Sequence, residues 1–494
     1  MQLRYENILF STYRTNTMSK DGKVHIQRQF SLQPDQLIPL RFAASIRYQK
    51  HDPTSLDVEI LFLGGEEERA EAYRATRAID INLVKLHAIN ESEDSINLLG
   101  LTRWRSSITG MTLEVGAIEI GIDRDDDDQP LEVSFTVELQ PSGILSGFGS
   151  IELHCNGDIN TLHRDEGQIL VQTSLGQIEA TEAYDYLDGK AFGDNVVHRI
   201  QRVRLIGKFK LEVGDTLRSL HDRLLEEIFP ICSALSLCYR QPVDAYEIEY
   251  LWKATSENPI KRAFYRRKWH KSREMTNDNE LIDSSNLRDG GLSILVQTLK
   301  DHPESKSLDR GIGFLSHSYV SFLETAYFMA FSAMETIVNA VSGDPDGLQI
   351  GSSAWRKVQK ALRKSLSDCA EGKSISLDTA KHMQEKLPEL RRASLASRID
   401  RVVEVYSVKT SDLWTAEGFA AGLKRASEFR HDLFHAAHTS DLDLMSVDLT
   451  RIRAFSERLL LAALSWPEDR RWAWRDDKVH RIIQPADPEA AAHD

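Results

Sequence analysis

Residues 430–435 read Arg430-His431-Asp432-Leu433-Phe434-His435, and a third imidazole follows at His438. The stretch lies in a segment whose apolar residues recur at spacings of three and four, namely Phe419, Leu423, Ala426, Leu433 and Ala437. Such a period predicts an amphipathic helix with one buried face. Arg430 falls on that face, where an apolar residue is expected. Because a buried cation needs an anion or a partner surface, this break in the pattern marks a candidate functional site.

The rest of the C-terminal part, residues 311–467, also has helical periodicity. Phe314–Val341 is apolar on almost every side, which predicts a central buried helix, and that helix carries a carboxylate, Glu335. Further amphipathic helices are predicted at Trp355–Cys369, Ala380–Leu390, Ile399–Val408 and Met445–Ala463, the last ending before Pro467. The sequence therefore predicts an all-α bundle over 311–467 and a tail over 468–494.

Residues 1–213 have the period of two that is typical of β-strands. Leu131–Leu139 alternates without interruption, and Val203–Val213 does so on both sides of Gly207. Shorter strands are predicted at Val58–Leu63, Ile96–Leu101, Met111–Ile122 and Ile169–Thr173, with one helix at Glu66–Arg77. Four consecutive aspartates, Asp125–Asp128, are expected at a solvated hairpin tip. We therefore expect an α+β multidomain chain whose N-terminal part is an antiparallel β-sandwich or barrel.

Residues 214–310 connect the two parts and contain one strongly basic window. Asp215 is expected to cap a helix that starts at Leu217 and that Pro230 kinks or ends, and a strand is expected at Tyr246–Leu251. The window then places cations next to an aromatic side chain, at Lys261, Arg262, Arg266, Arg267, Lys268 and Trp269. Cations for phosphates and aromatic faces for bases suit single-stranded nucleic acid, whereas a solvated loop is the structural alternative. Gly311-Ile312-Gly313, just beyond, is predicted as a turn.

Length and composition bound the class of protein. A chain of 494 residues is too long for one ordinary core, and 41% hydrophobic and 28% charged residues are typical of a soluble globular protein. The sequence has no apolar run long enough to span a membrane and no signal-peptide pattern at its start, so we expect a cytoplasmic location and no membrane partner. The formal net charge of -14 argues against indiscriminate coating of nucleic acid, but a local basic surface can still bind phosphate.

The stretch 430–435, together with the preceding apolar segment Tyr327–Glu335, resembles the HEPN superfamily, and especially its Apea-like ribonuclease branch from prokaryotic antiviral and abortive-infection systems. Ile231–Leu237 and Ser394–Asp400 fit the same branch. The resemblance extends from Asp215 to Pro467 and is best from Phe314 onward. It implies a C-terminal HEPN helical bundle and a toxin-like, metal-independent endoribonuclease without a cofactor. It also implies a homodimer or higher homo-oligomer through that bundle. A phage-derived trigger could act at the N-terminal β domain, which carries no family motif.

The residue types suit this chemistry. Cleavage of RNA by its own 2′-hydroxyl needs a base, an acid for the 5′-oxygen and a cation for the charge on the phosphate. By the resemblance, Arg430 holds the scissile phosphate, His435 transfers the proton and His431 supports them. Glu335 is expected either to pair with Arg430 across the bundle, or to pair with another residue or stay exposed. Two facing protomers would supply two Arg430–His435 sets. Positions five apart on a helix differ by about 140° around its axis, so the helix must distort or the arginine must reach round.

Two other functions fit the same residues. The helical bundle could dimerise without catalysis and bind RNA or a protein partner through the basic window. Alternatively, His431 and His435 share the i, i+4 spacing of metal ligands, and with His438 they could hold zinc in a hydrolase. The zincin pattern would need Glu at position 432, where this chain has Asp432, so a site without metal is the leading expectation.

Overall fold

The computed structural model divides the chain into two compact units, Met1–Val296 and Gln297–Asp494. It describes residues 23–32, 40–49, 54, 56–62, 64–76, 85–88, 95–99, 103–107, 109–123, 132–142, 144, 151–155, 158–162, 169–191, 194–212, 214–253, 261–268, 280–282, 284–288, 290–342, 351–391, 393–436 and 441–467. The predicted aspartate run Asp125–Asp128 and the predicted tail 468–494 lie outside the described residues.

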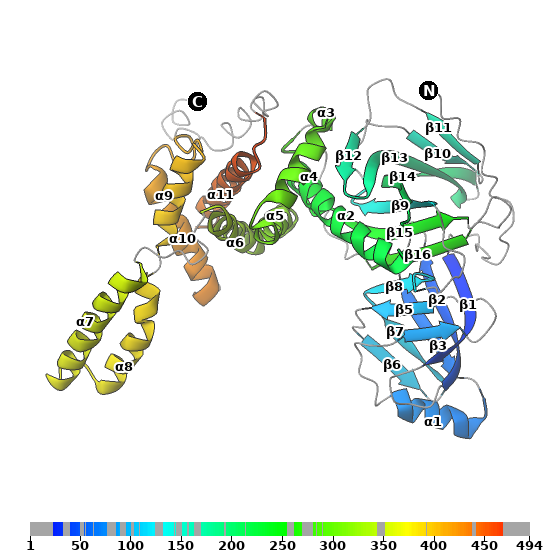
Figure 1. Cartoon of the computed structure of the whole chain (residues 1–494), viewed down its shortest axis with the longest axis horizontal. Coiled ribbons are helices and arrows are strands. Elements are labelled where there is room, and N and C mark those ends of the chain that lie inside the picture. The colour runs from blue at the N-terminus through cyan, green and yellow to red at the C-terminus, as the bar shows by residue number, and fades with distance from the viewer. Residues whose placement is uncertain are drawn as a thin grey trace. The chain divides into compact units, whose positions relative to one another are not determined.

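The first unit is built on antiparallel strands (Figure 1). The strands are β1 (Lys23–Leu32), β2 (Leu40–Gln49), β3 (Asp57–Phe62), β4 (Lys85–Ala88), β5 (Ser95–Leu99), β6 (Arg103–Ser107), β7 (Gly110–Glu114), β8 (Ala117–Ile120), β9 (Glu132–Gln140), β10 (Ile151–Cys155), β11 (Asp158–Leu162), β12 (Ile169–Thr173), β13 (Gly176–Ala191), β14 (Asp194–Lys210), β15 (Asp244–Trp252) and β16 (Lys261–Arg267). Their order is β11-β10-β13-β14-β9-β15-β16-β8-β5-β4-β1-β2-β3-β7-β6, and β12 pairs with β13. Among these described strands only β10 and β13 run parallel. The predicted antiparallel β architecture of the N-terminal half is confirmed.

The alternation that predicted the strands also decides which face is buried. On β9 the side chains of Val133, Phe135, Val137 and Leu139 are all buried. Phe135 lies opposite Gly207 of β14 and stacks on Phe209 at 4.4 Å between ring centroids. A Cβ at Gly207 would come within 2.5 Å of the Phe135 ring, so the glycine makes room for the aromatic pair.

The sheet continues beyond residue 213. β15 pairs with β9, and β16 pairs with both β15 and β8, so residues of the connecting region 214–310 complete the sheet. The strand predicted at Tyr246–Leu251 is confirmed as β15. The helix predicted at Glu66–Arg77 is confirmed as α1 (Glu66–Thr76).

One long helix, α2 (Leu217–Tyr239), follows β14, and its N-terminal cap differs from the prediction. Its cap is Thr216, whose hydroxyl accepts from the Ser219 N–H at 3.1 Å while the Thr216 N–H donates to the Ser219 hydroxyl at 3.0 Å. Asp215, the predicted cap, instead accepts from the Glu212 N–H and pairs with Arg223. The helix also passes through Pro230 without ending, because a buried face continues on both sides of it, from Leu217 to Tyr239.

The second unit is helical, as predicted. Its helices, with the short segments that precede it, are α3 (Ser284–Leu287), α4 (Gly291–Asp301), α5 (Ser305–Val320), α6 (Leu323–Val341), α7 (Ser352–Glu371), α8 (Leu377–Lys386), the 3-10 helix η3 (Leu387–Arg391), α9 (Leu395–Val405), α10 (Phe419–Ala436) and α11 (Leu442–Ala463). α6 packs against α5, α9, α10 and α11 and is the core helix of this unit. Among the described helices, none combines the length and the apolar character needed to cross a membrane.

The long apolar segment Phe314–Val341 was predicted as one helix, and this is wrong. It belongs to two helices, α5 and α6, with Ser321 and Phe322 between them. Phe322 is 87% exposed, so its apolar side chain contributes to the periodic pattern but not to the core. Gly311 and Gly313, predicted as a turn, lie inside α5. A Cβ at Gly311 would come within 2.7 Å of the Ile337 side chain, so this glycine lets α5 approach α6 closely.

Two glycines of the same helix provide a test of this packing. Gly311→Ala should destabilise the protein by about 1–3 kcal/mol, because the added methyl group overlaps Ile337. Gly313→Ala should instead stabilise it by up to about 1 kcal/mol, because nothing lies within 4 Å of its added Cβ and alanine favours the helix. Thermal unfolding of both variants measures the difference. Equal effects of the two substitutions would contradict the close approach of α5 and α6.

Candidate active site

The predicted motif occupies the last two turns of α10. The residues buried on this helix are Gly422, Leu423, Ala426 and Phe429. The predicted buried face is therefore confirmed at Leu423 and Ala426, while Ala437 lies outside the described residues. Arg430 follows directly on this face and is half-buried, and His431 is exposed. The motif thus begins where the buried side of α10 meets solvent.

Two contacts to other elements fix the buried side of α10. The Tyr327 hydroxyl on α6 donates to the carbonyl oxygen of Ala426 at 2.9 Å, and the Tyr327 ring meets Phe429 edge-on at 6.3 Å. Trp414 covers Gly422 so closely that a Cβ there would lie 2.1 Å from the indole ring. Both contacts are made directly to the backbone of α10, at Ala426 and Gly422. They therefore fix the position of α10 relative to Tyr327 and Trp414.

A buried aspartate on α11 holds α10 from the other side. Asp448 has a fully buried side chain and accepts hydrogen bonds from the indole N–H of Trp414 at 2.8 Å and from Arg425 at 2.9 and 2.7 Å. Arg451, one turn further on α11, adds a contact at 3.1 Å. Arg425 lies five residues before Arg430 on α10. The helical period alone did not predict this network, although the carboxylate of Asp448 beside Leu449, on an apolar helix face, indicates it.

Arg430 has a looser electrostatic environment than Arg425. Its Nη2 lies 3.7 Å from Oε2 of Glu335 on α6, and its guanidinium carbon lies 5.9 Å from the centroid of the Phe331 ring. The predicted pairing of Glu335 with Arg430 is present. Both side chains are about one-third exposed, so water screens the pair and it stabilises the fold by less than about 1 kcal/mol.

The imidazoles are only partly described. The side chain of His435 and the whole of His438 lie outside the described residues. The backbone of α10 is helical through position 436, so positions 430 and 435 differ by about 140° around the axis. Among the described residues, no group of three or more His, Cys, Asp or Glu side chains could hold a metal ion. The zinc alternative depends on His435 and His438 and stays a prediction.

The basic window lies in and beside β16, and its cations contact carboxylates. Arg266 is fully buried and donates to Glu247 at 2.5 Å. The other described pairs are Arg262 with Glu249 at 2.5 Å, Arg267 with Asp244 at 2.6 Å, and Lys268 with Glu114 at 3.1 Å. Lys261 is half-buried at the start of β16, and Trp269 lies outside the described residues. The window therefore offers phosphate less positive charge than its composition predicts.

The pair of Arg266 with Glu247 belongs to a row of buried charges across the sheet. Arg204 of β14 lies opposite Glu138 of β9, which lies opposite Glu247 of β15, which lies opposite Arg266 of β16. All four are buried, and Arg204 donates to Glu138 at 2.7 Å. Burial raises the pKa of Glu247, and Arg266 opposes that shift. Arg266 thus completes this row and is not available to a ligand at the surface.

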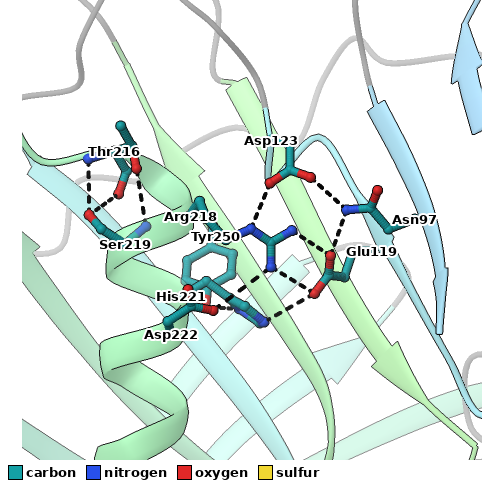
Figure 2. A network of polar contacts seen from close by, with 9 residues as sticks. All are labelled: Asn97, Glu119, Asp123, Thr216, Arg218, Ser219, His221, Asp222 and Tyr250. Atoms are coloured by element: carbon teal, nitrogen blue, oxygen red, sulfur yellow. Dashed lines mark hydrogen bonds and ion pairs between the residues drawn. The ribbon is translucent and has the colours of Figure 1, made fainter. Parts of the chain in front are cut away.

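A second cluster of titratable side chains joins α2 to the sheet (Figure 2). Arg218 of α2 donates to both oxygens of Glu119 on β8, at 2.9 and 2.5 Å, and to Asp123 at 2.6 Å. Asn97 of β5 donates to the same two carboxylates at 2.8 and 2.7 Å. Burial would raise the pKa of Glu119, but the hydrogen bonds from Arg218 and Asn97 outweigh it and hold that pKa below its usual range.

His221, one turn after Arg218, is buried in the same cluster. Its Nδ1 lies 2.7 Å from the Tyr250 hydroxyl on β15, and its Nε2 lies 3.7 Å from Glu119. Burial lowers the pKa of His221 to about 4, although Glu119 opposes the shift. The imidazole is therefore neutral at pH 7 and helps to anchor α2, and a role in proton transfer at neutral pH is unfavourable.

The buried histidine should make stability depend on pH. A histidine whose pKa is lower in the folded chain than in the unfolded chain, about 6.5, stabilises the fold fully above pH 6.5 and loses this effect as the pH falls towards 4. Between pH 7 and pH 5 the loss at His221 should reach about 2 kcal/mol. His221→Gln should reduce this dependence in thermal unfolding, whereas the exposed His382→Gln should not. Unchanged pH dependence in His221→Gln would contradict the assignment.

Comparison with known proteins adds no relative. No family model, no curated protein and no solved structure matches this chain. The candidate site therefore stands on its own residues: a half-exposed guanidinium at Arg430, a carboxylate at Glu335 and an exposed imidazole at His431, all at the junction of α6 and α10.

Proposed function

We propose that the helical unit is a metal-independent HEPN-type endoribonuclease of a prokaryotic antiviral, abortive-infection system, acting in the cytoplasm. The observation that carries the proposal is the position of Arg430. This cation sits at the solvent edge of the buried face of α10, in a loose pair with Glu335, directly before the exposed His431. A purely structural arginine on this helix is represented by Arg425, which is bound on two sides of its guanidinium.

The proposed reaction is a transesterification within the RNA. A base removes the proton of the 2′-hydroxyl, the 2′-oxygen attacks the adjacent phosphorus, and the bond from phosphorus to the 5′-oxygen breaks. The leaving 5′-oxygen takes a proton from an acid, and the products carry a 2′,3′-cyclic phosphate and a 5′-hydroxyl. Imidazole can serve as base or acid near neutral pH. Arg430 would stabilise the negative charge on the non-bridging oxygens through parallel N–H donors.

Helix geometry favours a site that two protomers share. Positions 430 and 435 of one helix differ by about 140° around the axis, which separates the guanidinium and the imidazole of a single chain. A second copy facing the first would supply a His435 beside the other Arg430. One imidazole then acts as base and the other as acid. In this proposal His431 supports His435, and Glu335 keeps Arg430 extended until phosphate replaces it.

The first unit would regulate this activity. Its strands form a separate unit with its own buried core, so it can bind a trigger, which we propose to be phage-derived, without rebuilding the nuclease. A homodimer formed through the helical unit would be the active form. The non-catalytic alternative, with RNA or a protein bound through the basic window, gains less support because Arg262, Arg266, Arg267 and Lys268 all contact carboxylates.

Incubation of the purified full-length chain with total RNA in EDTA tests the proposal. Wild type should produce fragments with 2′,3′-cyclic phosphate ends. Arg430→Ala and His435→Ala should each reduce the rate by at least about 10²-fold, because they remove the phosphate cation and the proton-transfer group. Lys424→Ala, which removes an exposed cation from the same helix, should leave the rate unchanged. The readout is the rate of fragment formation together with the chemistry of the fragment ends.

Three outcomes would count against the proposal. Full activity in both Arg430→Ala and His435→Ala would remove the site. Loss of wild-type cleavage in EDTA, together with stoichiometric zinc in the purified protein, would favour the hydrolase reading of His431, His435 and His438. RNA binding without any cleavage by wild type would favour the non-catalytic module.

A further inference from the structure

The helix α7 carries five cations within nine residues. They are Arg356, Lys357, Lys360, Arg363 and Lys364, and no acidic residue occurs before Asp368. All five side chains are exposed. Within the described part of the chain none of the five forms an ion pair, in contrast to the cations of β16. This is therefore a surface of unneutralised positive charge in a protein whose net charge is -14.

The five cations share one side of the helix. At 100° per residue they fall within an arc of about 120°, and from Arg356 to Lys364 they extend along about 12 Å of the axis. Several pairs are three or four positions apart, where like charges repel and destabilise a helix. The free protein gains nothing from this arrangement, whereas a polyanion alongside the helix would relieve the repulsion.

The opposite side of α7 is occupied by its own neighbour. The more buried residues on this helix include Trp355, Leu362 and Leu366, which lie away from the basic arc. α7 packs against α8 and η3, whose buried residues are Ala380 and Leu387. A basic amphipathic helix that binds a membrane needs its apolar side free for insertion. Trp355 is buried and Leu362 and Leu366 are partly buried, so among the described residues Val358 is the only large apolar side chain of α7 that is exposed, and the basic side fits a soluble polyanion better than a lipid surface.

We propose that the basic side of α7 binds the phosphate backbone of RNA and thereby delivers substrate to the nuclease. The choice of RNA over an acidic protein as the partner rests on the proposed function of the same unit. Flexible lysine and arginine side chains on one helix face contact phosphates without reading bases, so binding is independent of sequence. The buried Trp355 offers no face for base stacking, which agrees with a backbone contact.

Two matched double substitutions test this surface. Lys360→Glu/Lys364→Glu reverses two cations one turn apart on α7, and Lys306→Glu/Arg310→Glu reverses two exposed cations at the same spacing on α5. Both variants are made in the full-length His435→Ala chain, so that binding is measured without cleavage. The probe is a fluorescently labelled single-stranded RNA of mixed sequence, titrated by anisotropy over a series of salt concentrations. Circular dichroism checks that α-helical content is kept.

The α7 variant should bind at least about tenfold more weakly at 0.1 M salt, and its slope of log K against log salt should fall by about 1.4, two contacts at 0.7 each. The α5 variant should stay within about twofold of its parent. Equal losses in the two variants, or none in the α7 variant, would overturn the proposal. Binding of His435→Ala to phosphatidylserine vesicles but not to RNA would overturn it as well. If RNA binding depends on α7 but the wild-type chain never cleaves RNA, the proposed function fails and this binding surface stands.

Discussion

A charge that leaves water in this protein is paired with an opposite charge, and this requirement decides where its cations can act. An unpaired buried charge would cost several kcal/mol, and among the described sheet arginines Arg202 and Arg204 are paired with Glu138 and Arg266 with Glu247, each on the next strand. The two carboxylates lie opposite each other, and an arginine on either side offsets their mutual repulsion. The same requirement fixes α2, since Arg218 meets Glu119 and Asp123, which neighbouring sheet elements supply. Charge pairing thus positions the elements of the first unit.

In the helical unit, two arginines of α10 are paired with carboxylates that differ in burial. Arg425 faces the fully buried Asp448, which can be satisfied only by near and well-aligned donors. Arg430 faces Glu335, which is itself one-third exposed and can be solvated when the arginine moves away. Removing Arg425 would take two hydrogen bonds from the buried Asp448 carboxylate, whereas Glu335 stays in contact with water if Arg430 moves. The first arginine is therefore held more tightly by the fold than the second.

Local pattern predicted the elements well but not their partners. The alternation of β9 and the helical period around Leu423 and Ala426 give the buried faces directly, because burial follows the period of the backbone. The boundary between α5 and α6 at Phe322 was not predicted, because the sequence does not show whether a phenylalanine is buried or exposed. The pairing of Arg266 was not predicted, because its partner Glu247 lies on another strand, outside the basic window. The Glu335–Arg430 pair could be predicted only as one possibility, because the helical pattern places both residues in one bundle but does not align their helices.

The net charge of the protein differs from the local charge near a bound ligand. At physiological salt a phosphate interacts mainly with charges within a Debye length of about 8 Å. Most of the charges that make up the net charge of -14 lie farther away than that. What matters is whether nearby cations are already neutralised. The three arginines of β16 are, each by a carboxylate on β15, although their sequence is the more obviously basic. Those of α7 are not, because the described helix places its first acidic residue at Asp368, beyond the last of the five cations. A basic helix whose cations have no carboxylate partner among the described residues therefore presents more positive charge to an anion than a strand whose arginines are paired.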